Sequence, residues 1–230
     1  MSTYDTSAGD EYSEPASRSF RTYDLASFGA LHLLDVEHVV EGLIPTASLT
    51  LFAGREKGGK SLHMMDLACS VAAGEQYLGR DTIAGPVILG AAEDHPRSIR
   101  ARLLTRIGRD LSEDGRPIYI LPLGGVRLEA NQEPERLSLT DPIGIAQLTA
   151  TIQETGAVLC ILDCLRELHD EEENDSMMGA VVGPLRRIAH DTGCAIVLVH
   201  HARKSGGHRG STAIVAACDS VMEWIADDDE

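Results

Sequence analysis

The chain contains few aromatic side chains: Phe, Tyr and Trp make up 4% of its 230 residues, and only one residue is a tryptophan. Proteins often bind single-stranded nucleic acid by stacking its bases on such side chains, so the composition offers little sign of that mode. The chain also has no apolar run of about eighteen residues, the length of a membrane-spanning helix. Its first residues show neither the basic start nor the apolar core of a secretion signal. We therefore expect a cytoplasmic protein that is neither membrane-spanning nor secreted.

The cysteines form no C-x-x-C pair of the kind that signals zinc binding or redox chemistry. Five are present, mostly within apolar stretches expected to form strands or helices: Cys69, Cys160, Cys164, Cys194 and Cys218. The second and third of these are close in sequence, yet buried, reduced thiols explain them best. We therefore predict free cysteines in the core.

Positive charge is scarce. The 20 Lys and Arg residues stand against 36 Asp and Glu residues, a formal net charge of −16. This balance argues against a broad, nonspecific basic surface for nucleic acid, although it allows a narrow basic channel. Much of the acid is local, in the leading segment, in residues 170–175 and in residues 227–230.

The length suits one domain with a substantial core. Residues 1–24 are rich in Ser, Thr, Asp and Glu and lack hydrophobic periodicity, so we expect a disordered acidic segment there. We assign the domain to residues 25–226 and treat residues 227–230 as an acidic end. Residues 25–42 are expected to form a short, partly helical approach to the first strand.

The domain alternates apolar strand candidates with helix candidates. Strands are predicted over residues 47–53, 86–91, 118–121, 158–163 and 195–200, and helices over residues 61–73, 96–109, 142–155 and 177–192. Strands that are apolar on both faces, separated by helices, predict an α/β fold with a mainly parallel sheet covered on both sides. Residues 123–139 are left open as a hairpin or an irregular excursion.

A phosphate-loop motif is the most specific feature of the sequence. Residues 54–61 satisfy the pattern G-x-x-x-x-G-K-[ST] at every position, between a predicted strand and a predicted helix. In this motif backbone N–H groups cradle the phosphates of ATP, the lysine adds a point charge, and the hydroxyl ligates Mg²⁺. The predicted nucleotide-binding residues are Gly54, Arg55, Glu56, Lys57, Gly58, Gly59, Lys60, Ser61 and Leu62.

Carboxylates follow two other predicted strands. The strand over 158–163 ends in Asp163, which we predict to bind Mg²⁺ together with Ser61. The strand over 86–91 leads to Glu93 and Asp94. We predict that Glu93 aligns the attacking water and that Asp94 caps the next helix.

Paired histidines end a further strand. We predict that His200 or His201 senses the γ-phosphate, and the residues alone do not separate the two. The basic, glycine-rich residues 202–211 follow; they contact a nucleic-acid phosphate or a neighbouring subunit's nucleotide, or form a plain solvated loop. Five arginines lie on the predicted helix over 96–109. We expect most of them to form salt bridges on the surface, and one could instead reach a shared active site.

Taken together, these motifs resemble the RecA-like ATPases, and more narrowly the RepA-type group of plasmid hexameric replicative helicases. The resemblance spans about residues 44–224. It rests on the phosphate loop, on Ala91-Ala92-Glu93-Asp94 before an arginine-bearing helix, on Leu162-Asp163-Cys164-Leu165-Arg166 before an acidic stretch, and on His200-His201-Ala202-Arg203-Lys204-Ser205 before Arg209-Gly210-Ser211.

The resemblance implies a RecA-type core that assembles into a ring, as in the hexameric members of the group, with ATP between adjacent subunits. It implies that Glu93 is the catalytic glutamate, that Asp163 is the Mg²⁺-associated aspartate and that the histidine pair contains the sensor. Arg102 and Arg209 stand where the group places arginines that reach a neighbour's γ-phosphate. The acidic stretch 170–175 would lie near the inner face of the ring.

The leading hypothesis is therefore an oligomeric, Mg²⁺-dependent ATPase that acts on single-stranded DNA in replication of a plasmid, a phage or a similar element. The alternative is a non-motor regulator or assembly protein that uses ATP to control binding to protein partners, which suits the net acidity. A small-molecule kinase is a third hypothesis, but no acceptor pocket or lid can be identified in the sequence.

Overall fold

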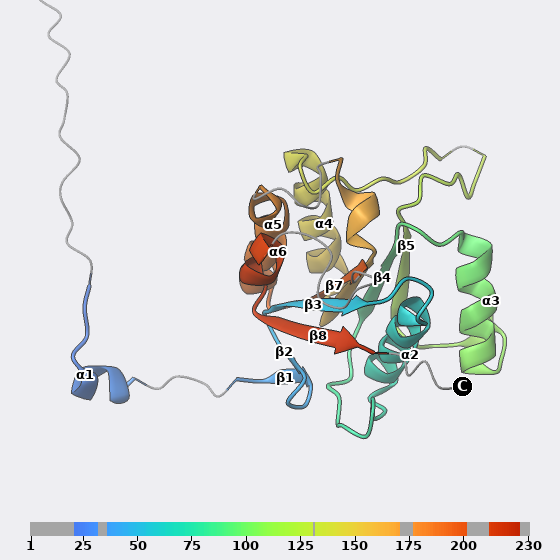
Figure 1. The fold of residues 1–230 in the computed structure, drawn as a ribbon. Helices are drawn as coiled ribbons and strands as arrows, with labels where there is room; N and C mark the ends of the chain where they lie inside the picture. The colour runs from blue at the N-terminus through green and yellow to red at the C-terminus, as the bar shows by residue number, and fades with distance from the viewer. Residues whose placement is uncertain (1–20, 32–35, 131, 171–176, 202–211, 226–230) are drawn as a thin grey trace, which may run out of the picture. The chain divides into compact units, whose positions relative to one another are not determined.

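The computed structural model describes residues 21–31, 36–130, 132–170, 177–201 and 212–225 (Figure 1). It divides the chain into two compact units, residues 1–35 and 36–230. In the first unit, helix α1 (Leu25–Gly29) follows Asp24, whose Oδ1 accepts a hydrogen bond from the Ser27 N–H at 2.7 Å. This side-chain cap satisfies one of the free N–H groups at the start of the helix. The disorder predicted for residues 1–24 falls mostly outside the described residues.

A parallel sheet of six strands forms the centre of the second unit. The strand order is β5-β4-β6-β7-β3-β8, and every pairing within it is parallel. The strands are β3 (Leu49–Gly54), β4 (Val87–Ala91), β5 (Ile118–Pro122), β6 (Leu159–Asp163), β7 (Ala195–His201) and β8 (Ser220–Trp224). A short antiparallel pair, β1 (His38–Val40) and β2 (Ile44–Pro45), precedes the sheet.

Helices cover both faces of the sheet (Figure 1). Because successive side chains of a strand point to opposite faces, Leu159 and Ile161 of β6 enter one core and Cys160 and Leu162 enter the other. Helices α2 (Lys60–Ala73) and α3 (Pro96–Ile107) complete the first core. Helices α4 (Pro142–Thr155), α5 (Met178–Thr192) and α6 (Thr212–Ala217) complete the second.

The predicted elements are largely confirmed. All five predicted strands and all four predicted helices are present, with bounds within two residues of those expected. The predicted α/β class with a mainly parallel sheet is therefore correct. Two short 3₁₀ turns, at Leu111–Glu113 and Leu165–Leu168, complete the list of described elements.

The structure decides a point that the sequence left open and shifts one helix end. Residues 123–130 and 132–139 contain no strand, so they form an excursion and not a hairpin. Helix α3 ends at Ile107 because Gly108 adopts φ +74° and closes it, which leaves Arg109 outside the helix. The sequence pattern did not predict β1, β2, β8 or α6. Among the described residues, no helix combines the length and apolar character that crossing a bilayer requires.

Candidate nucleotide site

Neighbouring strands bring the predicted site residues to one edge of the sheet. β3 ends at Gly54, β4 leads to Glu93, β6 ends at Asp163 and β7 ends at His201. In the sheet register Ala91 pairs with Asp163, and Gly54 pairs with His201. Ligands of open parallel sheets bind at the carboxyl ends of the strands, so this edge is the candidate site.

The phosphate loop has the backbone shape that an anion site requires. Gly59 adopts φ +84° as the N-cap of α2 and has no side-chain cap bond. The first N–H groups of α2 are therefore available to an anionic ligand. A Cβ on Gly58 would lie 3.0 Å from the carbonyl oxygen of Arg55. The backbone at these two positions is thus too close for a larger residue, which explains the glycine.

The only tryptophan supports this loop from the adjacent strand. Trp224 Nε1 donates a hydrogen bond to the carbonyl oxygen of Gly58 at 2.8 Å, and its ring centroid lies 3.7 Å from that of His63. No sequence motif assigns Trp224 to the site. Only the pairing of β8 with β3, which sets Trp224 opposite Gly54, places it there.

Lys60 lies folded into the loop and is 5% exposed. Its Nζ donates to the carbonyl oxygen of Arg55 at 2.8 Å and to His201 Nδ1 at 3.1 Å. Burial lowers the pKa of Lys60, and the negative charge of Asp163 opposes this shift. The ammonium group thus has neutral hydrogen-bond acceptors that phosphate oxygens could replace, with a gain in charge pairing.

Asp163 is 8% exposed at the end of β6. Burial raises the pKa of its carboxyl group, a hydrogen bond from Ser61 lowers it, and the charges of Asp94 and Glu93 raise it further. The adjacent hydroxyl and carboxylate are hard oxygen ligands of the kind that Mg²⁺ prefers. Ser61 and Asp163 therefore offer a pair of oxygen ligands that would suit a Mg²⁺ ion.

The buried charge of Asp163 should cost the fold stability. When the folded pKa of a carboxyl lies above its unfolded value, stability falls as pH rises through the interval between the two, and the whole cost is present above the folded pKa. We expect Asp163→Asn to raise the free energy of unfolding at neutral pH by on the order of 1 kcal/mol, a usual size for such trade-offs.

Urea denaturation without nucleotide or metal, at pH 7 and near pH 4, measures this effect. The advantage of the variant should shrink at the lower pH, where the wild-type carboxyl takes up its proton. A variant less stable than the wild type at pH 7 would refute the account of Asp163.

The alternation of side chains along β7 separates the two histidines. His200 is 1% exposed, on the side of the strand that Ile196 and Leu198 direct into the core of α4 and α5. His201 lies on the opposite side, where Nδ1 meets Lys60 and Nε2 lies 3.3 Å from Glu93 Oε2. His201 therefore joins the phosphate-loop lysine to the predicted catalytic carboxylate.

Glu93 projects from the edge with its side chain 51% exposed. Beside it lies Cys164, which is 1% exposed and whose Sγ is 3.4 Å from Glu93 Oε2. Burial raises the pKa of the Cys164 thiol, and the charge of Glu93 raises it further. All five cysteines are free, as predicted, but the sequence analysis gave no sign that one of them contacts the site.

The arginine predictions have mixed outcomes. Arg102 forms an ion pair with Asp94 of its own chain. The predicted cap role of Asp94 is wrong, because His95 is the N-cap of α3 and its Nδ1 accepts from the Arg97 N–H at 3.1 Å. Arg106 pairs with Asp66, as expected for a salt-bridged surface. The predictions for Arg209, for the loop 202–211 and for the acidic residues 171–175 lie outside the described residues.

A comparison with protein-family models matches residues 17–207 to the AAA_25 family, described as an AAA domain. The chain belongs to this family. The match covers the phosphate loop, Glu93, Asp163 and the histidine pair, and it is consistent with the RecA-like P-loop ATPase of the RepA type predicted from the sequence. Membership of an AAA family supports ATPase activity in general and implies that the AAA domain binds nucleotide.

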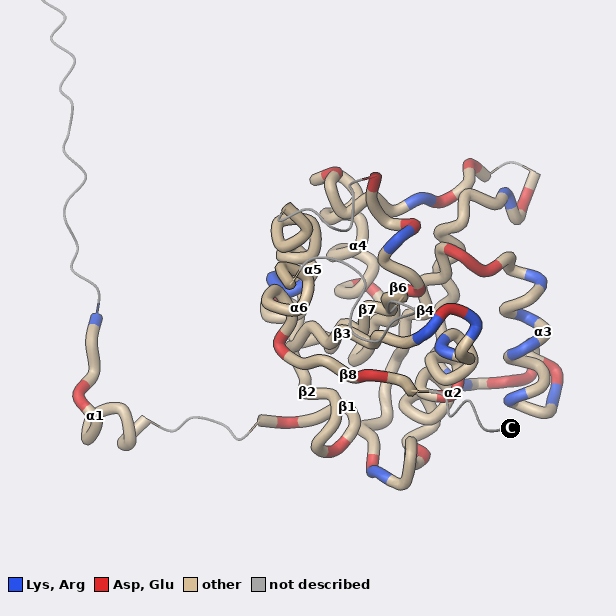
Figure 2. Tube along the Cα trace, in the orientation of Figure 1, with Lys and Arg blue, Asp and Glu red and all other residues tan. Residues whose placement is uncertain are grey.

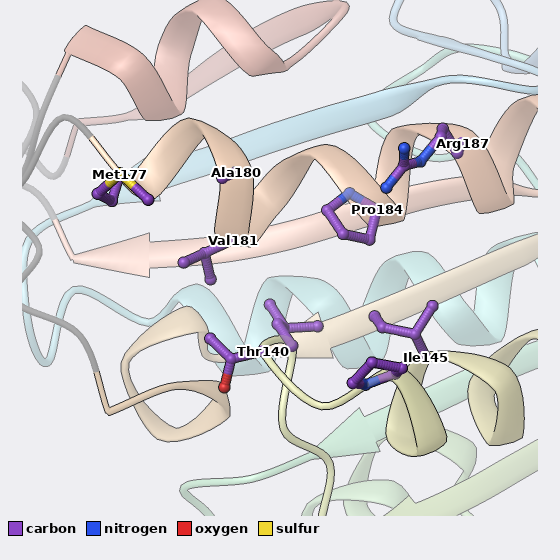
Figure 3. Close-up of a pocket in the computed structure, with 9 residues that line it drawn as sticks. Thr140, Ile145, Met177, Ala180, Val181, Pro184 and Arg187 are labelled. Carbon is purple, nitrogen blue, oxygen red and sulfur yellow. The ribbon is translucent and has the colours of Figure 1, made fainter.

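A separate hollow of about 420 Å³ lies on the other face of the AAA domain, between the start of α4 and α5 (Figure 3). Thr140 and Ile145 line one side, and Met177, Val181 and Pro184 line the other. Of the predicted site residues that the structure describes, none lines this hollow. The candidate nucleotide site is therefore the strand edge and not this apolar groove.

Proposed function

We propose that the chain is a Mg²⁺-dependent ATPase that works as an oligomer on single-stranded DNA, in the manner of RepA-type replicative helicases. The observation that carries the ATPase part is the linked set of Lys60, His201 and Glu93, in which the ring of His201 bridges the phosphate-loop lysine and the carboxylate. Asp163 and Ser61 lie beside this set at the same strand edge.

In the proposed reaction, the N–H groups at the start of α2 hold the β- and γ-phosphates. Lys60 gives up its hydrogen bonds to Arg55 and His201 and donates to phosphate oxygens instead. Its positive charge then neutralises negative charge that develops as the γ-phosphoryl group is transferred to water. A bound Mg²⁺ would supply charge neutralisation at the phosphates, held by Ser61 and Asp163. Glu93 orients water for attack on the γ-phosphorus and accepts its proton.

His201 is the proposed sensor. The Lys60 ammonium donates to Nδ1, so a neutral ring carries its proton on Nε2, facing Glu93. Departure of Lys60 to the phosphates removes that hydrogen bond and frees the ring to turn. The residues that follow His201 in the chain would then respond to the state of the nucleotide.

The oligomeric and DNA-dependent parts rest on the resemblance to RepA-type proteins and on the arginines. Figure 2 shows Lys and Arg gathered along α3 and at the phosphate loop, in a chain of net charge −16. Arg102 is 39% exposed in its side chain and stands on α3 close to the site edge. An arginine donated across a subunit contact would make turnover depend on assembly, because it stabilises transition-state charge that one subunit leaves unpaired.

ATP turnover measured over a protein-concentration series, with and without single-stranded DNA, tests these two parts. We expect activity per chain to rise with protein concentration as subunits assemble, and to rise again when DNA is added. Turnover indifferent to DNA would contradict the helicase proposal. Activity per chain independent of concentration would contradict an arginine acting between subunits.

The net acidity supports a second candidate, a non-motor ATPase that controls binding to protein partners. It predicts turnover that DNA leaves unchanged. The same concentration series therefore separates the two candidates.

A further inference from the structure

Three side chains with different metal-binding atoms meet at the end of β6. Cys164 Sγ lies 3.4 Å from Glu93 Oε2 and 3.6 Å from His201 Nε2, and the latter two atoms are 3.3 Å apart. The three residues are far apart in sequence, and only the order β4-β6-β7 brings them together. No C-x-x-C or similar spacing could reveal such a set.

The triangle has the dimensions of one face of a zinc tetrahedron. Zinc lies about 2.3 Å from sulfur and about 2.0–2.2 Å from nitrogen or oxygen, so tetrahedral angles set a sulfur about 3.6 Å from either partner and the nitrogen and oxygen about 3.4 Å apart. The observed separations of 3.4, 3.6 and 3.3 Å agree with these values to within about 0.2 Å.

Hydrogen bonds alone would also hold three polar groups at such distances. Two further features favour a metal site: the chemical types of the three ligand atoms, and the exposure that lets a cation reach them. Thiolate, imidazole and carboxylate are the three ligand classes that zinc accepts, and three protein ligands with one open position form a common zinc site. Cys164 is buried, but Glu93 is 51% and His201 17% exposed in their side chains. A cation can therefore approach from the solvent side of Glu93.

We propose that Glu93, Cys164 and His201 form a binding site for Zn²⁺ or a similar thiophilic divalent cation, distinct from the oxygen pair of Ser61 and Asp163. As the metal bonds form, the Cys164 thiol releases its proton to solvent, and the single proton of the neutral His201 ring is exchanged from Nε2 to Nδ1. Because Nδ1 then donates, Lys60 loses it as an acceptor and keeps the carbonyl oxygen of Arg55.

Occupation of this site would block hydrolysis. It would engage the carboxylate proposed to orient water and the ring proposed to sense the γ-phosphate, so zinc is expected to inhibit turnover in the presence of excess Mg²⁺. This consequence rests on the proposed function. The binding itself does not, and it can be measured without nucleotide.

Titration of the full chain with Co²⁺, in excess Mg²⁺ and without nucleotide, tests the proposal. A cobalt–thiolate bond produces a charge-transfer absorption that oxygen ligands do not produce, and a tetrahedral site gives strong visible bands. We expect both signals to saturate at one Co²⁺ per chain and to vanish when Zn²⁺ is added. Absence of the thiolate band in the wild-type chain would overturn the proposal.

Two ligand variants and one matched control locate the site. Cys164→Ser should abolish the thiolate band, and His201→Asn should weaken cobalt binding at least about tenfold, since even outer-shell partners are commonly worth that much. Cys218→Ser changes a thiol whose Sγ bonds the carbonyl oxygen of Ile214, away from the site, and should keep the band. Circular dichroism checks that each variant is folded.

Three results would refute the proposed metal site. A band that survives in Cys164→Ser, or that Cys218→Ser removes, would show that the metal binds elsewhere and would refute the site. Undiminished affinity in His201→Asn would also refute it. Because these readings need no ATP, a chain that binds cobalt as proposed but hydrolyses nothing would contradict the proposed function and leave the metal site standing.

Discussion

Glu93→Gln is expected to lower the kcat of ATP hydrolysis by about 10²–10⁴-fold, the usual contribution of a general base. The amide can still accept the hydrogen bond from His201 Nε2, which lies 3.3 Å from the present carboxylate oxygen. It cannot take a proton from water. The geometry of the edge should thus persist while the chemical step fails, and the dissociation constant for ATP should change little.

Single-turnover hydrolysis and equilibrium binding of ATP, measured on the same preparation, separate these two effects. Glu154→Gln, on the exposed surface of α4, is the matched control for loss of one negative charge and should keep the wild-type rate. A Glu93→Gln enzyme with a rate within a few fold of the wild type would exclude Glu93 as the base.

Lys60→Ala is expected to abolish measurable turnover and to weaken ATP binding. A charge-assisted hydrogen bond is worth about 1.5–3 kcal/mol, so the affinity should fall by roughly 10–100-fold. The kcat should fall by at least about 10²-fold, since the lysine also neutralises charge in the transition state. Trp224 contacts the loop through the Gly58 carbonyl, and its fluorescence offers a direct readout of nucleotide binding.

Arg127→Ala removes one positive charge from an exposed ion pair with Glu133 and serves as the control. It should bind and hydrolyse ATP like the wild type. Unchanged ATP affinity and turnover in Lys60→Ala, in a chain with native circular dichroism, would refute the assignment of the phosphate loop.

The sequence predicted the elements of this fold well because its strands are short apolar runs bounded by Gly, Pro or charged residues. The helix ends were also predictable, because glycine commonly follows the last turn of a helix. Gly74, Gly156 and Gly193 adopt positive φ directly after α2, α4 and α5. The phosphate loop was predictable because its chemistry needs particular residues at fixed spacing within one segment.

Strand order was not predictable, and the finer structure of the site depends on it. β7 lies between the strand of the phosphate loop and the strand of Asp163. This order places His201 beside Lys60 and Cys164 beside Glu93. The spacing of these residues in the sequence predicts neither contact. The same reason hid Trp224, which reaches Gly58 only because β8 pairs with β3.

Local competition explains the error at Asp94. A cap was expected from an aspartate near a helix start, since such residues commonly cap helices. The Asp94 carboxylate instead forms an ion pair with Arg102, and His95, directly before Pro96, caps the helix. Because α3 begins at Pro96, His95 occupies the N-cap position, and Asp94 lies one residue before it.

The most direct test of the account is the release of phosphate from ATP and Mg²⁺ by identically purified wild-type, Glu93→Gln and Lys60→Ala chains. The account predicts multiple turnovers by the wild type and background release by both variants. Equal release by all three chains, or no release by the wild type under assembling conditions, would contradict an ATPase site at this strand edge.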